Sequence, residues 1–227
     1  MEKLIVANWK AEKNISEASS WVKTIRHILE ESVVKVVICP DFVSIPVVRG
    51  LLKDTSVGLG AQDISSEDKG PHTGEVVVDS LKGLVDCVIL GHSERRSGQA
   101  ETTTMIIKKV GHADRVGITP IVCFSSLEEV RDYHKSHGPT EKIYFAYEPL
   151  LAIGTDKPQG SEEAKKHLES FKEILGDIDL LYGGSVEENN VRSYLSVGFQ
   201  GVLVGNASLN EEQFAKIVRI ANDNKSL

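Results

Sequence analysis

The 227-residue sequence has little cysteine, no excess of positive charge and no long apolar run. Its three cysteines, Cys39, Cys87 and Cys123, lack the closely spaced pairing that is typical of zinc sites. Each lies in an apolar stretch, so we expect three buried, reduced thiols and no metal. The formal charge of −7 disfavours nucleic acid as a partner, because binding to a phosphate backbone needs a basic face.

No apolar run approaches the roughly 18 residues that a membrane-spanning helix needs. No leader-like pattern precedes the first predicted strand, so we expect a cytoplasmic protein without a membrane partner. The sequence also lacks a linker, a low-complexity tract or a block of like charge that would mark a domain boundary. These absences predict one domain over residues 1–227, a length close to the roughly 250 residues of an α/β barrel.

Short apolar runs alternate with segments of helical periodicity along the whole chain. Most runs are continuously apolar, as in strands that are buried on both faces of a parallel sheet. The eight predicted strands are Leu4–Ala7, Val34–Cys39, Val57–Ala61, Cys87–Leu90, Ile118–Cys123, Ile143–Tyr147, Ile178–Tyr182 and Val202–Val204. The predicted helices are Ser16–Glu30, Phe42–Leu52, Val78–Lys82, Glu101–Arg115, Leu127–His137, Ser161–Leu175, Glu187–Val197 and Glu211–Asn222. Pro46 predicts that the second helix is irregular or starts late.

Strict alternation of strand and helix predicts a parallel sheet. Eight units allow closure into a (β/α)8 barrel, although periodicity alone also allows an open, doubly wound sheet. Polar residues follow several of the strands: Asn8 and Lys10 the first, His92 and Glu94 the fourth, and Glu148 the sixth. Each has an ordinary structural explanation by itself, but the carboxyl ends of barrel strands form one face, which is where barrel enzymes carry their sites.

These segments resemble the triosephosphate isomerase family from the first strand to the last helix. The matching motifs are Asn8-x-Lys10, Gly60-Ala61-Gln62-Asp63, His72-Thr73-Gly74-Glu75, Gly91-His92-Ser93-Glu94-Arg95-Arg96, Ala146-Tyr147-Glu148-Pro149, Ala152-Ile153-Gly154-Thr155 and Tyr182-Gly183-Gly184-Ser185-Val186. The resemblance implies α/β architecture as a single (β/α)8 TIM barrel. It also implies cofactor-free interconversion of dihydroxyacetone phosphate and glyceraldehyde 3-phosphate, in glycolysis and gluconeogenesis.

The resemblance assigns roles in moving one proton between adjacent carbons through an enediolate. Glu148 is the expected base, and His92 the donor to the carbonyl oxygen, because the family uses a glutamate base with a neutral histidine. Lys10 supplies positive charge beside the enediolate, and Asn8 orients it. Glu94 is expected to position Lys10, although an ion pair with an arginine is an open alternative.

The phosphate of the substrate is expected to bind to backbone N–H groups. By resemblance, the donors are Gly154, Ser185, Gly205 and Asn206, the last two entering a helical turn after the eighth strand. The segment 149–159 resembles the family's mobile lid. Asn206 stands where the family usually has a second glycine, and a proline, Pro158, lies at the far end of the lid; neither departure removes a residue that does chemistry.

Other functions and assembly states stay open at this point. Another phosphate-binding barrel isomerase or aldolase would not need Asn8, Lys10, His92 and Glu148 together, and a barrel that only binds sugar phosphates would not need the base. The loop with Thr73 resembles the segment that inserts into a neighbouring subunit, so we expect a homodimer with Thr73 at its interface. The short stretch between Cys123 and Glu148 predicts a short fifth helix, and we expect the sixth helix to be trimmed as well. The apolar surface thus uncovered would favour a homotetramer.

Overall fold

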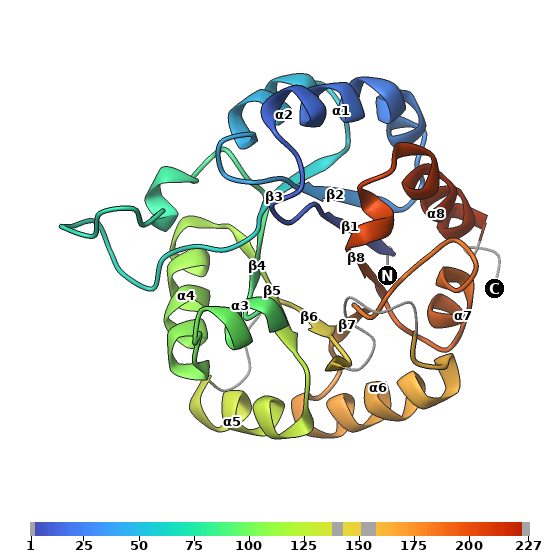
Figure 1. The fold of residues 1–227 in the computed structure, drawn as a ribbon. Helices are drawn as coiled ribbons and strands as arrows, with labels where there is room; N and C mark the ends of the chain where they lie inside the picture. The colour runs from blue at the N-terminus through green and yellow to red at the C-terminus, as the bar shows by residue number, and fades with distance from the viewer. Residues whose placement is uncertain (1–2, 138–142, 151–157, 224–227) are drawn as a thin grey trace.

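The structure, a computed structural model, describes residues 3–137, 143–150 and 158–223. Its strands are all parallel and close into one barrel, in which β8 pairs with β1 (Figure 1). The strands are β1 (Leu4–Asn8), β2 (Lys35–Cys39), β3 (Gly58–Ala61), β4 (Cys87–Leu90), β5 (Thr119–Phe124), β6 (Tyr144–Tyr147), β7 (Asp179–Tyr182) and β8 (Gly201–Val204). The predicted closed (β/α)8 barrel is therefore confirmed, and the open sheet is excluded.

The helices surround the ring of strands (Figure 1). They are α1 (Ile15–Glu30), α2 (Ile45–Leu51), α3 (Ser93–Gly98), α4 (Thr103–Val116), α5 (Leu127–His137), α6 (Ser161–Leu175), α7 (Val191–Ser196) and α8 (Glu211–Asp223), with the 3₁₀ turns η1 (Val78–Ser80) and η3 (Asn206–Ser208). The start of α1 shows why its sequence forms a helix: the Asn14 side chain accepts the Glu17 N–H, and the Glu17 carboxylate accepts the Asn14 N–H. This capping box satisfies backbone donors that the helix leaves free.

Pro46 predicts a late start for the second helix, and α2 does start late, at Ile45, because a proline fits the first turn of a helix but not its interior. Two other predicted outer elements need correction. The segment from Val78 forms only the turn η1. Helix α7 starts at Val191, because the Asn190 side chain bonds the Ser185 carbonyl and the Glu187 N–H and holds the preceding residues in a turn. Helix α6 has the predicted bounds, Ser161–Leu175, and its trimming relative to the family stays a prediction.

Two apolar layers hold the barrel together. One fills its interior with side chains that include Val6, Ile89, Ile121 and Leu203, and the other lies between the strands and the helices. The three cysteines are free and buried in the interior layer, as predicted. Across the described parts of the chain, no helix combines the length and apolarity that crossing a bilayer requires.

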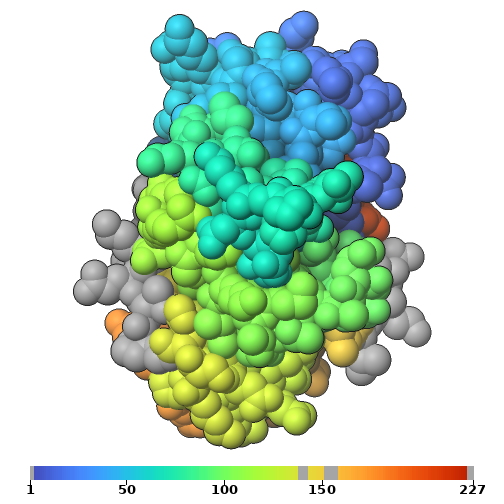
Figure 2. Space-filling view, turned by 90° about the vertical axis from the view of Figure 1, so that its left-hand side faces the viewer, coloured from blue at the N-terminus to red at the C-terminus, as the bar shows by residue number. Residues whose placement is uncertain are grey.

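One long loop, residues 64–77, leaves the body of the barrel between β3 and η1. It extends well beyond the ring of helices in Figure 1, and Figure 2 shows it lying across the face that it leaves. The Ser65 N–H donates to the Val76 carbonyl at 2.9 Å and closes the base of the loop, and Arg115 of α4 pairs with Asp68 at 3.1 Å. Residues 67–75 are exposed, so the tip has little of this chain to pack against.

Candidate active site

The end of β1 holds Lys10 in a left-handed backbone conformation, with φ of 52°. Such a φ is uncommon for a residue with a side chain, so neighbouring groups must stabilise it. The Asn8 side-chain oxygen accepts the Lys10 N–H at 3.2 Å, and the Gln62 amide donates to the Lys10 carbonyl at 2.7 Å. The Lys10 ammonium donates to Glu94 at 2.6 Å. The structure thus brings Asn8, Lys10 and Glu94 together, and Glu94 pairs with Lys10 rather than with an arginine.

His92 follows β4 and forms the N-cap of α3. Its Nδ1 atom accepts the Glu94 backbone N–H at 3.3 Å, so Nδ1 carries no proton. In the neutral imidazole the proton is then on Nε2, which lies 3.1 Å from Oε1 of Glu148. The first turn of α3 therefore fixes His92 as a donor through Nε2, on the side of Glu148.

Glu148 follows β6 and is 1% exposed. Its N–H donates to the Phe124 carbonyl at 2.8 Å, and its Oε2 atom accepts the Ser93 N–H at 2.8 Å. Burial raises the pKa of this carboxyl, while His92 and the Ser93 N–H oppose the increase. A buried carboxylate with a raised pKa beside a neutral imidazole is a good candidate for a general base.

Two glycines after β7 make room for this carboxylate. A Cβ atom at Gly183 would lie 3.2 Å from the Cγ atom of Glu148, and one at Gly184 would lie 2.7 Å from the Cγ atom of Pro149. The second contact is too short for any real side chain. The Gly-Gly pair therefore lets the segment after β6 pack directly against the end of β7.

The predicted phosphate donors lie after β7 and β8. Ser185 has a left-handed φ of 48°, and Gly205 precedes the turn η3, which begins at Asn206. A Cβ atom at Gly205 would lie 3.5 Å from the Cε atom of Lys10, so this loop borders the lysine. Asn206 does not have a positive φ, so its replacement of glycine costs no backbone strain. Gly154, and residues 151–157 of the predicted lid over 149–159, lie outside the described residues.

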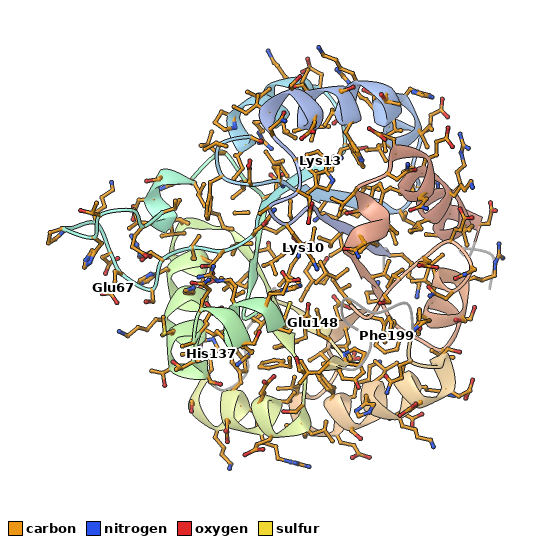
Figure 3. The ribbon with its side chains drawn as sticks, in the orientation of Figure 1. Lys10, Lys13, Glu67, His137, Glu148 and Phe199 are labelled. Carbon is orange, nitrogen blue, oxygen red and sulfur yellow. The ribbon has the colours of Figure 1, made fainter. Side chains whose placement is uncertain are left out.

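A cavity of about 320 Å³ opens between the loops that follow β1 to β4. It is lined by Asn8, Lys10, Ala11, Phe42, Gln62, Asp63, His92, Glu94, Arg95 and Gln99. Glu148, Ser185, Gly205 and Asn206 do not line it, and in Figure 3 Lys10 and Glu148 both lie toward the middle of the ring of strands. Sequence reasoning missed Gln62, although the motif Gly60-Ala61-Gln62-Asp63 at the end of the third strand was a usable signal.

Within the described ranges, no three His, Cys, Asp or Glu side chains are grouped so that they could hold a metal ion. The groups that the structure gathers at the carboxyl ends of β1, β4 and β6 are an ammonium, an imidazole and a carboxylate. Together they can take a proton from carbon, donate a hydrogen bond to a developing oxyanion and stabilise its charge.

A closed parallel barrel with these groups at the carboxyl ends of its strands defines a barrel enzyme of the acid–base class. The sequence profile of the triosephosphate isomerase family matches residues 3–221. Proteins named triosephosphate isomerase are 36% identical in Dehalococcoides mccartyi, 37% in Dictyoglomus thermophilum and 35% in Thermus thermophilus. These alignments cover 96–98% of this chain and 98–99% of the relatives. The chain belongs to the triosephosphate isomerase family.

Proposed function

We propose that the cleft carries out the family's reaction with Glu148 as the base and His92 as the electrophile. The chain interconverts dihydroxyacetone phosphate and glyceraldehyde 3-phosphate, an aldose–ketose isomerisation. The observation that carries the assignment of roles is the 3.1 Å approach of His92 Nε2 to Glu148 Oε1, with the imidazole proton on Nε2. A substrate carbonyl placed between the loops that follow β4 and β6 would meet the His92 donor on one side and the Glu148 base on the other.

The proton and electron balance of this step is simple. The Glu148 carboxylate takes the proton from the carbon next to the carbonyl, and the C–H electrons form the carbon–carbon double bond of the enediolate. Nε2–H of His92 stabilises the charge that develops on the carbonyl oxygen and passes its proton to that oxygen, and Nε2 then takes the hydroxyl proton from the neighbouring oxygen. Glu148 returns its proton to the carbon that carried the carbonyl, so the neighbouring carbon–oxygen pair becomes the new carbonyl. Burial supports this role, because a raised pKa makes Glu148 a stronger base than an exposed glutamate.

Lys10, Asn8 and Glu94 are proposed to stabilise the enediolate and the phosphate. The Lys10 ammonium borders the proposed phosphate loop, because a Cβ atom at Gly205 would lie 3.7 Å from its Nζ atom. Asn8 accepts the Lys10 N–H and Gln62 donates to the Lys10 carbonyl, so the peptide units on both sides of Lys10 are held, and Glu94 holds its ammonium. A preorganised cation does not need to reorient when charge develops, which is the main benefit of such a site.

The phosphate donors are proposed to be the backbone N–H groups of Gly154, Ser185, Gly205 and Asn206. The described members of this set follow β7 and β8, which is the usual position of phosphate sites in barrels of this type. No metal or cofactor enters the proposal. The net charge of −7 supports a small anionic substrate held by local dipoles rather than nucleic acid. As an enzyme of glycolysis and gluconeogenesis, the protein is proposed to act in the cytoplasm.

The proposed base is tested by Glu148→Gln. We expect turnover in both directions to fall by roughly 10²–10⁴, the usual effect of removing a positioned general base, while a phosphorylated enediolate mimic still binds. Glu129→Gln is the matched control, because Glu129 also accepts a backbone N–H, from Ser125 at 2.7 Å, but lies outside the cleft. Turnover of the Glu148 variant within about threefold of the control would reject the assignment.

We also propose that the protein is a homo-oligomer, at minimum a homodimer with the Thr73 loop at its interface. The loop 64–77 extends away from its own barrel (Figure 1). The cavity beside Asn8 and Lys10 offers a place for the loop of a second copy, and Phe42, which lines it, is an exposed apolar residue. Val43 and Val47 are also exposed beside Phe42, so an apolar surface adjoins the cavity. Such a patch beside a cavity is typical of an interface.

The tetramer has less support. It would need apolar surface on the outer helices that follow β4 to β6. The exposed large apolar side chains of the described residues are Ile15, Val33, Phe42, Val43, Val47 and Leu150, and none lies on α4, α5 or α6. We therefore favour the homodimer.

A further inference from the structure

Lys13 is a cation close to the site that none of the roles above uses. It precedes the N-cap of α1, and it is half-buried. Its ammonium donates to the Leu209 carbonyl at 2.8 Å and lies 5.8 Å from the centre of the Trp9 ring. In Figure 3, Lys13 lies farther from the middle of the barrel than Lys10. Lys13 therefore faces the outer side of the loop that follows β8.

Leu209 is the C-cap of the turn η3, whose N-cap and first residue are the proposed phosphate donors Gly205 and Asn206. Its N–H donates to the Asn206 carbonyl at 2.9 Å, and the Ser208 hydroxyl donates to the Gly205 carbonyl at 2.7 Å. The Ser208 carbonyl accepts the Trp21 indole N–H at 3.0 Å. The last two carbonyls of the turn are thus held by donors from the region of α1, Trp21 and Lys13.

Peptide groups in a 3₁₀ turn point the same way, with carbonyls toward the C-terminal end and N–H groups toward the N-terminal end. A donor that fixes the carbonyls at one end therefore also fixes the direction of the N–H groups at the other. At that other end, Gly205 borders Lys10. A positive charge at the C-terminal end is also the favourable sign for the dipoles of the turn.

We propose that Lys13 is a positioning residue for substrate phosphate, which it affects by anchoring the η3 turn at Leu209 without touching the substrate. This inference rests on the proposed phosphate site at Gly205 and Asn206. Lys10 acts beside the reacting carbons, whereas Lys13 acts only through the loop. The loss of Lys13 should therefore weaken the interaction of the enzyme with phosphate-bearing ligands selectively.

The chain contains a matched control for this interaction. The Lys3 ammonium also donates to a backbone carbonyl near β8, that of Phe199, and at the same distance of 2.8 Å. Lys3 precedes β1 and Phe199 precedes β8, so this contact lies at the amino ends of the strands, away from the cleft. Lys3→Met and Lys13→Met remove the same type of bond from opposite ends of the barrel.

The test compares Lys13→Met, Lys13→Arg and Lys3→Met with the unchanged chain in three measurements. These are kcat and KM with glyceraldehyde 3-phosphate, competitive inhibition by inorganic phosphate, and deprotonation of glyceraldehyde, which has no phosphate. For Lys13→Met we expect KM and the phosphate inhibition constant to rise by about five- to tenfold, the scale of one charge-assisted hydrogen bond. The rate with glyceraldehyde should stay within twofold, Lys13→Arg should recover most of the affinity, and Lys3→Met should leave all three unchanged.

Two outcomes would overturn the proposal. One is unchanged phosphate affinity in Lys13→Met, and the other is an equal loss of rate with glyceraldehyde, which would indicate a general structural role. Asn206→Asp separates this failure from failure of the phosphate site itself, because a carboxylate there should repel phosphate whatever Lys13 does. If Asn206→Asp weakens phosphate inhibition and Lys13→Met does not, only the role of Lys13 is wrong. If neither does, the phosphate site is elsewhere and both proposals fail.

Discussion

The chemistry of this site depends on which atoms of single residues carry protons. His92 can donate to a carbonyl oxygen only if its proton is on Nε2, and the Glu94 N–H at Nδ1 enforces that tautomer. The residue types were readable from the sequence, because glutamate, histidine and lysine at strand ends form a recognisable pattern. The tautomer of His92 could not be read from the sequence, because it depends on the direction of one backbone N–H group in α3.

The tautomer gives a direct prediction. With ¹⁵N-labelled histidine, the ring nitrogens of His92 should report a neutral imidazole at pH 7, with Nε2 protonated and Nδ1 bare, both with and without a phosphorylated enediolate mimic. A change of His92→Gln would assign the signals. An imidazolium at pH 7 in the complex, or a proton on Nδ1, would contradict the geometry at the start of α3.

At the scale of elements, buried ion pairs join the end of β3 to the helices α3 and α4. The Lys109 ammonium of α4 bonds Asp63, which follows β3, at 2.8 Å, and it also bonds Glu101. Arg95 of α3 pairs with Asp63 at 2.8 Å. Burial raises the pKa of Asp63 to about 6, with the cations opposing the increase. A buried network of this type makes stability depend on pH.

The sign of that dependence follows from the raised pKa. Between about pH 4 and pH 6 the folded chain holds the Asp63 proton more tightly than the unfolded chain does. The free energy of unfolding should therefore fall as the pH rises through this range, relative to that of Asp63→Asn, by on the order of 1–3 kcal/mol. Urea unfolding of both proteins at pH 4.5, 5.5 and 7 measures the difference. Parallel stability curves would show that Asp63 does not titrate in this way.

Packing between neighbouring strands gives a second prediction at this scale. A Cβ atom at Gly60 of β3 would lie 2.5 Å from the Cys39 sulfur and 2.8 Å from the Cys87 sulfur. Gly60→Ala should therefore destabilise the fold by about 1–3 kcal/mol through overpacking. Cys87→Ala should relieve part of this cost in the double variant. In Gly111→Ala, inside α4, the added methyl meets nothing within 4 Å, so this control should be neutral or slightly stabilising.

This prediction is tested by calorimetric or urea unfolding of four proteins: the unchanged chain, Gly60→Ala, the double variant Gly60→Ala/Cys87→Ala, and Gly111→Ala. Equal stability of Gly60→Ala and Gly111→Ala would show that the two sulfurs move aside at little cost. Such crowding is invisible to sequence reasoning, which read the strand correctly but could not tell which of its residues face the two cysteines inside the barrel.

The sequence predicted the whole barrel better than its outer elements, for a physical reason. Barrel strands are buried on both faces, so their composition is strongly constrained, and all eight were found within a few residues. The ends of outer helices depend on local side-chain bonds, such as those of Asn190 before α7, which override periodicity. The proposed assembly depends on surfaces that composition does not describe, and exposed apolar side chains such as Val43 are seen only in three dimensions.

At the scale of the whole molecule, the exposed surface beside the cleft predicts how copies associate. Val43 is 67% exposed and lies next to Phe42, which lines the cavity proposed to receive the loop of a second copy. Val43→Glu would place a carboxylate in that interface, where burial without a partner is costly. Val33→Glu is the control, because Val33 is 50% exposed but lies before β2, at the opposite end of the barrel.

Sedimentation equilibrium is the measurement. The unchanged chain and Val33→Glu should sediment at twice the 24.8 kDa chain mass, and Val43→Glu at one chain mass. The monomeric variant should also lose activity, because the Thr73 loop would no longer cover the cavity beside Asn8 and Lys10. Four chain masses for the unchanged protein would reject the homodimer in favour of the tetramer, and one chain mass would reject association altogether. If Val43→Glu stayed dimeric, the interface would have to lie on another face, since an unpaired carboxylate at the centre of an apolar contact would not be tolerated.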